Sequence, residues 1–225
     1  MNSTILGAQS APALAMNPAG AWIVVWQSGD AVFAQRYDAD GAAILTGGVQ
    51  EFQVSEVGRA ASAPRAAMDQ DGGLVVVWTG AGADDADGIY ARRSSSDGSL
   101  GAVFLVNSQT AGVQDAPDVA MDEDGRFVAA WRTPDGDGSG IAWRRFNADA
   151  TPKGAEAFVN VSTAGDQAAP AVGVDPDGLL TVVWQSGTSI VGRQYLSDGT
   201  PLTGEFLVDS SAAPGAGAPA VGVGP

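Results

Sequence analysis

The residues of this 225-residue chain that could do chemistry are almost all carboxylates. It has 26 Asp and Glu against 11 Lys and Arg, no His and no Cys, and a formal net charge of -15. The lack of His and Cys excludes the commonest general base, the commonest transition-metal ligand, thiolate metal sites and Cys nucleophiles. The charge disfavours nucleic-acid partners. Calcium binding and carboxylate-catalysed glycoside hydrolysis are the chemistries left.

Paired acids recur in short motifs that end in Gly: DQDG at 69–72, DEDG at 122–125 and DPDG at 175–178, with NPAG at 17–20 as an acid-free copy. Asp early in a type I turn and Gly at its end predict a tight hairpin. Calcium needs about six to eight oxygen ligands, so turn chemistry explains two recurring acids better, and calcium stays open as the one cofactor. The candidate metal ligands are Asp69, Asp71, Asp122, Asp124, Asp175 and Asp177.

Two acidic, glycine-rich stretches vary most between copies of the pattern, TGAGADDADG at 79–88 and RTPDGDGSG at 132–140. Binding and catalytic residues concentrate on variable loops. The alternative is that these two loops are solvated connections between strands and bind nothing. Trp143 joins them as a candidate, because it replaces a small residue found in the other copies. The candidate ligand-binding residues are Asp84, Asp85, Asp87, Arg132, Asp135, Asp137 and Trp143.

The elements that position these residues repeat along the chain. Trp26, Trp78, Trp131 and Trp184 lie 52, 53 and 53 residues apart. A period of about 50 is typical of stacked supersecondary units. We therefore expect one domain over 1–225, with repeats at 2–54, 55–106, 107–159 and 160–208 and a partial fifth at 209–225.

Each repeat predicts four short strands. An Ala-Pro dipeptide begins the first strand, as in APALAM at 11–16, and Pro is placed at strand starts because it cannot donate to a ladder. An unbroken apolar run such as WIVVW at 22–26 follows the turn and predicts a strand buried on both faces. A third, alternating strand and a short fourth complete the unit. Four antiparallel strands per repeat predict an all-β protein, a β-propeller of four-stranded blades.

Two columns of the repeat have a structural and a functional interpretation. The Trp column is expected to fill space between blades, with sugar stacking as the alternative. Arg36, Arg93 and Arg145 are expected to pair with carboxylates or stack on rings, with repeated sugar binding as the alternative.

The segments MDQDGGLVVVW and VVWQSGDAVFAQRYDADG resemble the tandem repeats of large secreted bacterial proteins, whose units read close to AVAMDADGDFVVVWQS…GIYAQRFDADG…EFQVN. Such repeats often accompany hemolysin-type calcium-binding or cadherin-like modules and are generally taken as propeller blades. The resemblance covers nearly the whole chain and implies an extracellular or cell-surface location, although no signal peptide is visible. It implies no catalytic residues.

These observations favour a non-catalytic, adhesin-like binding or scaffold module that is not an enzyme, with a glycan or a surface protein as partner. No membrane span is expected. The surplus APAVGV at 218–223 predicts self-association or continuation into further repeats. A multivalent carbohydrate-binding lectin and a glycosidase-like enzyme are the alternatives.

Overall fold

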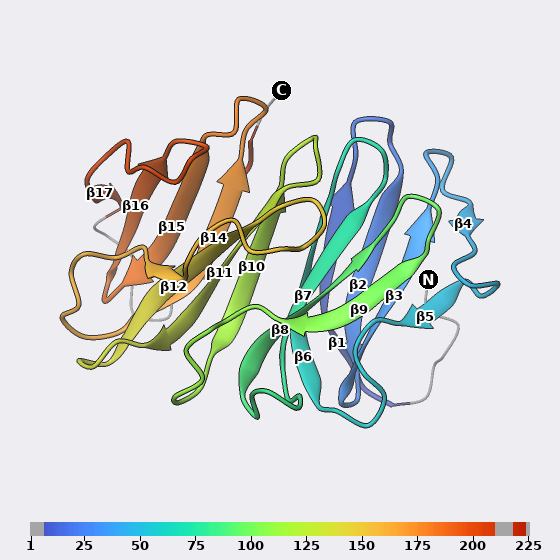
Figure 1. The fold of residues 1–225 in the computed structure, drawn as a ribbon, viewed down its shortest axis with the longest axis horizontal. Coiled ribbons are helices and arrows are strands. Elements are labelled where there is room, and N and C mark those ends of the chain that lie inside the picture. The colour runs from blue at the N-terminus through green and yellow to red at the C-terminus, as the bar shows by residue number, and fades with distance from the viewer. Residues whose placement is uncertain (1–6, 210–217, 224–225) are drawn as a thin grey trace.

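The computed structural model describes residues 7–209 and 218–223. Residues 1–6, 210–217 and 224–225 lie outside it, and with them parts of the first and fifth predicted repeats. The described residues form strands and turns, and none of them belongs to a helix that could cross a membrane. Four antiparallel sheets follow one another along the chain, which confirms the prediction of an all-β fold built from four-stranded blades (Figure 1).

Each sheet runs in chain order from an inner first strand to an outer last strand. Blade 1 contains β1 (Gln9–Met16), β2 (Trp22–Ser28), β3 (Ala31–Tyr37) and an outer edge divided into β4 (Ala43–Ile44) and β5 (Glu51–Gln53). Blade 2 contains β6 (Ala61–Met68), β7 (Leu74–Gly80), β8 (Gly88–Ser94) and β9 (Leu100–Leu105). Blade 3 contains β10 (Asp115–Met121), β11 (Phe127–Pro134), β12 (Ser139–Phe146) and β13 (Ala157–Phe158). Blade 4 contains β14 (Gln167–Val174), β15 (Leu180–Ser186), β16 (Ser189–Tyr195) and β17 (Phe206–Asp209).

Every first strand contains a β-bulge at its Ala-Pro dipeptide. The register of β10 against β11 shifts between Asp115 and Asp118, and the other three first strands shift at the same place. The Ala before each Pro has a left-handed backbone, with φ of 48° to 50°. A β-bulge bends its strand and re-aims the side chains that follow it. The bulged residues are Ala11, Ala63, Ala116 and Ala169.

The core lies between consecutive blades. Trp78 packs in the cluster between blades 1 and 2, Trp131 in the one between blades 2 and 3, and Trp184 in the one between blades 3 and 4. Their exposed fractions are 2%, 0% and 1%. The prediction that the Trp column fills space between blades is therefore confirmed for these three residues, whereas Trp26 lines a hollow on blade 1.

The Arg column joins each blade to the next. The Arg36 guanidinium donates to the carbonyls of Gly72 and Ser96 in blade 2. Arg93 donates to the Gly125 carbonyl in blade 3 and lies 3.5 Å from the Asp69 carboxylate. Burial lowers the pKa of both Arg side chains, and carboxylates near them act in the opposite direction. The column is thus structural in blades 1 and 2, because its donors are taken up by the protein.

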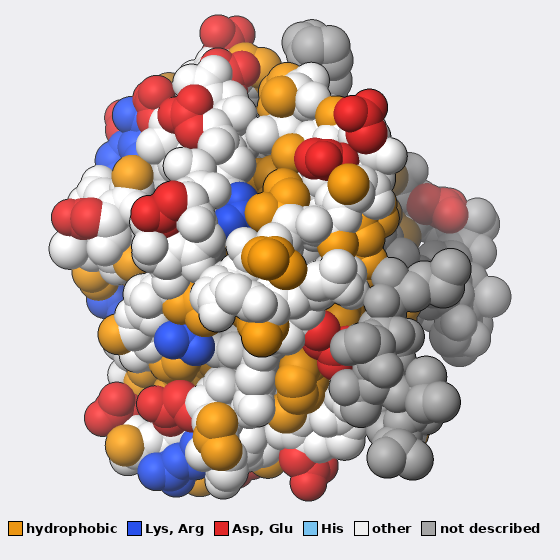
Figure 2. Space-filling model, turned by 90° about the vertical axis from the view of Figure 1, so that its right-hand side faces the viewer, with side chains coloured by type: hydrophobic (Ala, Val, Ile, Leu, Met, Phe, Trp, Pro, Cys, Tyr) orange, Lys and Arg blue, Asp and Glu red, His pale blue; other side chains and the backbone are white. Residues whose placement is uncertain are grey.

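The two ends of the array lie on opposite sides of the molecule (Figure 1). Beyond blade 4, Val221 lies against Gly173 of β14, so that a Cβ at Gly173 would come within 2.6 Å of it. At the other end, Figure 2 shows hydrophobic side chains gathered on the surface. Trp22, Val24 and Trp26 help to line a hollow of about 340 Å³ on the side of blade 1 that faces away from blade 2.

Candidate functional site

The two predicted loops lie beside the connector between blades 2 and 3, where Asn107 contacts Asp85 and Gln109 contacts Pro134. In the loop between β7 and β8, the Asp85 carboxylate accepts a hydrogen bond of 2.8 Å from Asn107, and the Tyr90 hydroxyl donates to the Asp85 carbonyl at 2.6 Å. Asp85 is buried, and its bonds hold the loop in shape. Asp84 and Asp87 are exposed on the same loop. This stretch therefore offers two solvated acids and one structural acid.

The loop between β11 and β12 carries the second predicted group. Arg132 forms a two-bond ion pair with Asp115, at the start of β10. Asp135 folds its own turn by accepting the N–H of Asp137, which is exposed. The second carboxylate oxygen of Asp135 is buried and has no hydrogen-bond partner among the described residues.

Trp143 lies apart from these loops. Its ring packs on Tyr195 of blade 4 with centroids 4.4 Å apart, and the Arg145 guanidinium lies 5.6 Å from the Trp143 ring centroid. The side chain is 6% exposed within the core between blades 3 and 4. Trp143 thus replaces a small residue in order to fill that interface.

The acidic turns are built as turn chemistry predicts. The first acid of each turn accepts the backbone N–H four residues later: Gly73 donates to Asp69, Arg126 to Asp122 and Leu179 to Asp175. The acid at the third position of each motif is exposed; these acids are Asp71, Asp124 and Asp177. No cluster of three or more acids that could hold a metal occurs within the described ranges. Calcium binding at these turns stays a prediction.

The strongest constellation was not among the predicted residues. An inner cavity of about 470 Å³ is lined by the starts of β6, β10 and β14 and by residues 218–221. Its walls are mostly the Ala and Pro residues of the repeated dipeptide. Two charged side chains interrupt this small, apolar lining: Arg65 from blade 2 and Asp118 from blade 3. Both lie directly after a bulge, where the strand re-aims its side chains.

Asp118 is held from two sides. One carboxylate oxygen accepts the Val172 N–H of β14 at 2.8 Å, and the other lies 3.9 Å from Nε of Arg65. The side chain is 22% exposed, against 42% for Arg65. Burial raises the pKa of Asp118, although the hydrogen bonds from Val172 and Val119 and the charge of Arg65 act in the opposite direction. A carboxyl group with a raised pKa can keep its proton and donate it.

The repeat contained a signal for this pair. The residue after each Ala-Pro is Ala13, Arg65, Asp118, Ala171 and Ala220, so that ionisable groups break a small-residue column twice. A residue found in a single repeat is not needed by the repeat itself, and the pattern alone marks both positions as exceptions. What the pattern lacks is the bulge that brings two positions 53 residues apart to one cavity.

Fold and cavity define a β-propeller with an acid and a cation on its inner surface. No protein-family model matches the sequence, and no curated protein does either. Solved structures share the fold. An endo-arabinase from Bacteroides thetaiotaomicron is 12% identical with a TM-score of 0.56, over 89% of this chain and 81% of that chain. A GH43 β-1,3-galactosidase is 9% identical with a TM-score of 0.55, over 90% and 78%.

The microbial sialidase Hz136 is 14% identical with a TM-score of 0.58, and the match covers 91% of this chain but 47% of the sialidase. The expectations of a non-catalytic scaffold module and of a protein that is not an enzyme are corrected by these comparisons. The solved structures with this fold include glycan-cleaving enzymes. The sequence had left a glycosidase-like enzyme only as an alternative, because the resemblance to the tandem repeats implies no catalytic residues. Catalysis by carboxyl groups needs neither His nor Cys, and Asp118 is the carboxyl group in the lining of the inner cavity.

Proposed function

We propose that this protein is a glycosidase-like enzyme whose proton donor is Asp118. The observation that carries the proposal is the Arg65–Asp118 pair in the inner cavity. All the remaining repeats have Ala at the position after the Ala-Pro dipeptide. The shared fold with an arabinase and a galactosidase supports the choice of a glycan as substrate.

The roles follow from the chemistry of the two groups. Glycosidic bond cleavage needs a carboxylic acid that is still protonated when it meets the leaving oxygen, and burial favours that form of Asp118. Asp118 gives this proton to the leaving oxygen as the glycosidic bond breaks. A water molecule adds to the sugar carbon, and the proton that the water loses returns to the Asp118 carboxylate. Arg65 is the more exposed partner, and its guanidinium can donate to sugar hydroxyls or to an anionic group while it faces the carboxylate. The bulges of β6 and β10 hold the two side chains on one cavity wall.

The test is cleavage of a panel of polysaccharides by the wild-type chain, with arabinan, β-1,3-galactan, xyloglucan and sialylated glycans as substrates. New reducing ends report hydrolysis. Asp118→Asn keeps the shape and the acceptor for Val172 but has no proton to give, so we expect activity to fall by about 100-fold or more. Asp40→Asn, at an exposed turn of blade 1, is the matched control and should keep full activity. A wild-type protein that cleaves none of the panel overturns the proposal.

Three further properties are proposed on the sequence alone. We infer that the blades belong to the tandem-repeat type of large secreted bacterial proteins and that the chain works outside the cell or at its surface. We also propose that calcium binds at the acidic turns and that residues 218–223 pair with another chain. Calorimetric titration with calcium and the mass of the purified protein in solution test the last two.

A further inference from the structure

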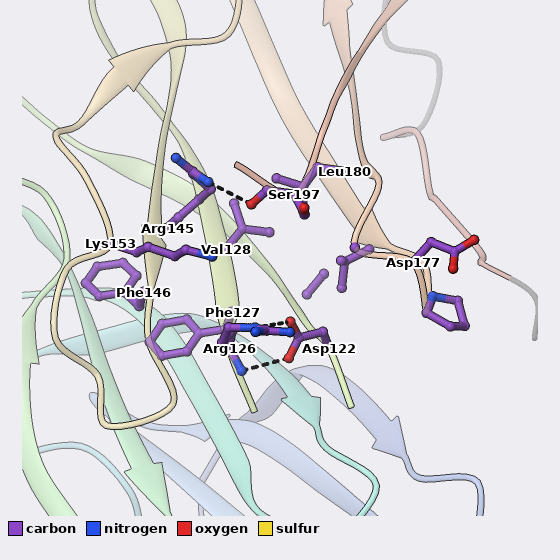
Figure 3. A pocket seen from close by; sticks show the side chains of 14 residues that line it. Asp122, Arg126, Phe127, Val128, Arg145, Phe146, Lys153, Asp177, Leu180 and Ser197 are labelled. Carbon is purple, nitrogen blue, oxygen red and sulfur yellow. Dashed lines mark hydrogen bonds and ion pairs between the residues drawn. The ribbon is translucent and has the colours of Figure 1, made fainter. Parts of the chain in front are cut away.

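A second pocket lies between blades 3 and 4, at the C-terminal end of β10 (Figure 3). It has a volume of about 150 Å³, which is small beside the roughly 300–1,000 Å³ of a drug-sized site. Apolar side chains, among them Phe127, Val128 and Leu180, form part of its lining. Three of the chain's 11 cations line the same pocket: Arg126, Arg145 and Lys153.

Two of these cations break columns of the repeat. Lys153 is the only Lys in the chain. Its backbone N–H donates to the Arg145 carbonyl, just as the backbone N–H of Leu202 donates to the Gln194 carbonyl in blade 4. The same position is Ile44 in blade 1, where it pairs with Arg36. Arg126 stands at the turn position of Ala21, Gly73 and Leu179. Blade 3 therefore carries two cations that its fold does not require.

The third cation is freed by a change in the Arg column. Arg36 and Arg93 each donate to the carbonyl of a turn Gly in the next blade. Arg145 donates to the Ser197 carbonyl at 2.9 Å, and within the described part of the chain it makes no bond to Gly178. The interface that the other two guanidiniums close thus stays open here, and Arg145 borders the pocket with donors to spare.

The cations of the pocket differ in how their neighbours hold them, and the Asp198 carboxylate acts on Arg145. Arg126 is held by Asp122 at 2.8 Å and by Asp124 at 2.6 Å, and Figure 3 shows its bonds to Asp122 below the pocket. Asp177 is exposed at the rim. The Lys153 ammonium has no hydrogen bond or ion pair with any described residue, and Figure 3 shows it reaching toward Val128. In a chain of net charge -15, Lys153 is thus a cation that its described neighbours leave available to an anionic ligand.

We propose that this pocket binds the carboxylate of an acidic sugar, with Lys153 and Arg145 as donors and the apolar lining against the sugar ring. A carboxylate matches one guanidinium and one ammonium, and the small volume fits a single sugar residue better than a long segment. The choice of a sugar as carrier rests on the proposed function, whereas the preference for an anion rests on the pocket.

The test is calorimetric titration of the full chain with glucuronate, glucose, acetate and sulfate. We expect glucuronate to bind more tightly than the other three and to weaken as salt is added. Lys153→Met should weaken glucuronate binding about tenfold, a change of 1.4 kcal/mol. Arg59→Met removes the same charge from an exposed residue outside the pocket and should leave the affinity unchanged. Thermal unfolding checks that both variants fold.

Equal affinity of Lys153→Met and wild type overturns the proposal, and so does binding of acetate or sulfate as tight as that of glucuronate, because the sugar then plays no part. No binding of glucuronate to wild type overturns it as well. Calorimetry needs no turnover, so a protein that binds glucuronate here but cleaves no glycan refutes the proposed function alone. Loss of this binding with cleavage retained refutes only the pocket.

Discussion

Replacing Asp118 in two ways separates its structural role from its chemical one. Asp118→Ala leaves the Val172 N–H without its acceptor, and Val172 is 5% exposed, so water cannot easily replace the lost bond. An unsatisfied buried donor costs about 1–3 kcal/mol. Asp118→Asn keeps an oxygen acceptor at the same place, so its loss of stability should stay below about 1 kcal/mol. Urea unfolding at pH 7, followed by Trp fluorescence, measures both.

The stability of wild type relative to Asp118→Asn has a pH dependence whose sign follows from the raised pKa of Asp118. The folded protein holds this proton more tightly than the unfolded chain, so the stabilisation is complete below the ordinary pKa of 3.8 and is lost as the pH rises through the folded pKa. The stability of wild type relative to Asp118→Asn should therefore fall from acid toward neutral pH. Equal stability of the Ala and Asn variants would refute the role of the hydrogen bond from Val172. A stability of wild type relative to Asp118→Asn that rises with pH would refute the raised pKa of this half-buried carboxyl group.

Three other substitutions test the scaffold. Trp131→Ala removes a fully buried ring between blades 2 and 3 and should cost about 3–5 kcal/mol in urea unfolding; a cost below about 1 kcal/mol contradicts the packing. Arg93→Met leaves the buried Asp69 without its cation and should cost about 1–3 kcal/mol, whereas unchanged stability with loss of sugar binding would favour a ligand role. Ala116→Gly relieves a left-handed backbone that costs Ala about 1–2 kcal/mol, so it should be more stable than Ala120→Gly in the same strand.

The periodic part of this molecule could be predicted from the sequence because periodic residues serve the blade itself. Trp131 and the turn acid Asp122 recur in nearly every repeat, and both do what their residue type and position indicate. Asp85 was harder to interpret. Its sequence neighbours suggest a solvated loop, whereas its partner Asn107 lies 22 residues away and buries it.

The inner cavity could not be predicted in the same way. Arg65 and Asp118 occupy the variable position of a motif whose fixed residues, Ala and Pro, indicate only a strand start. The bulge at each Ala-Pro places that variable position on a shared cavity wall. A left-handed Ala is disfavoured by its own backbone and is imposed by the surrounding sheet. Tertiary context therefore created the site, and the sequence showed it only as two exceptions in a column.

The measurement that tests the central claim most directly compares wild type and Asp118→Asn on one glycoside with two leaving groups. A leaving group that is the hydroxyl oxygen of another sugar needs a proton as the bond breaks, whereas a dinitrophenolate leaving group does not. If Asp118 is the proton donor, the variant should lose about 100-fold or more in rate on the natural linkage and far less on the dinitrophenyl glycoside. Equal losses on both substrates, or no loss on either, would contradict the assignment of Asp118 as the acid.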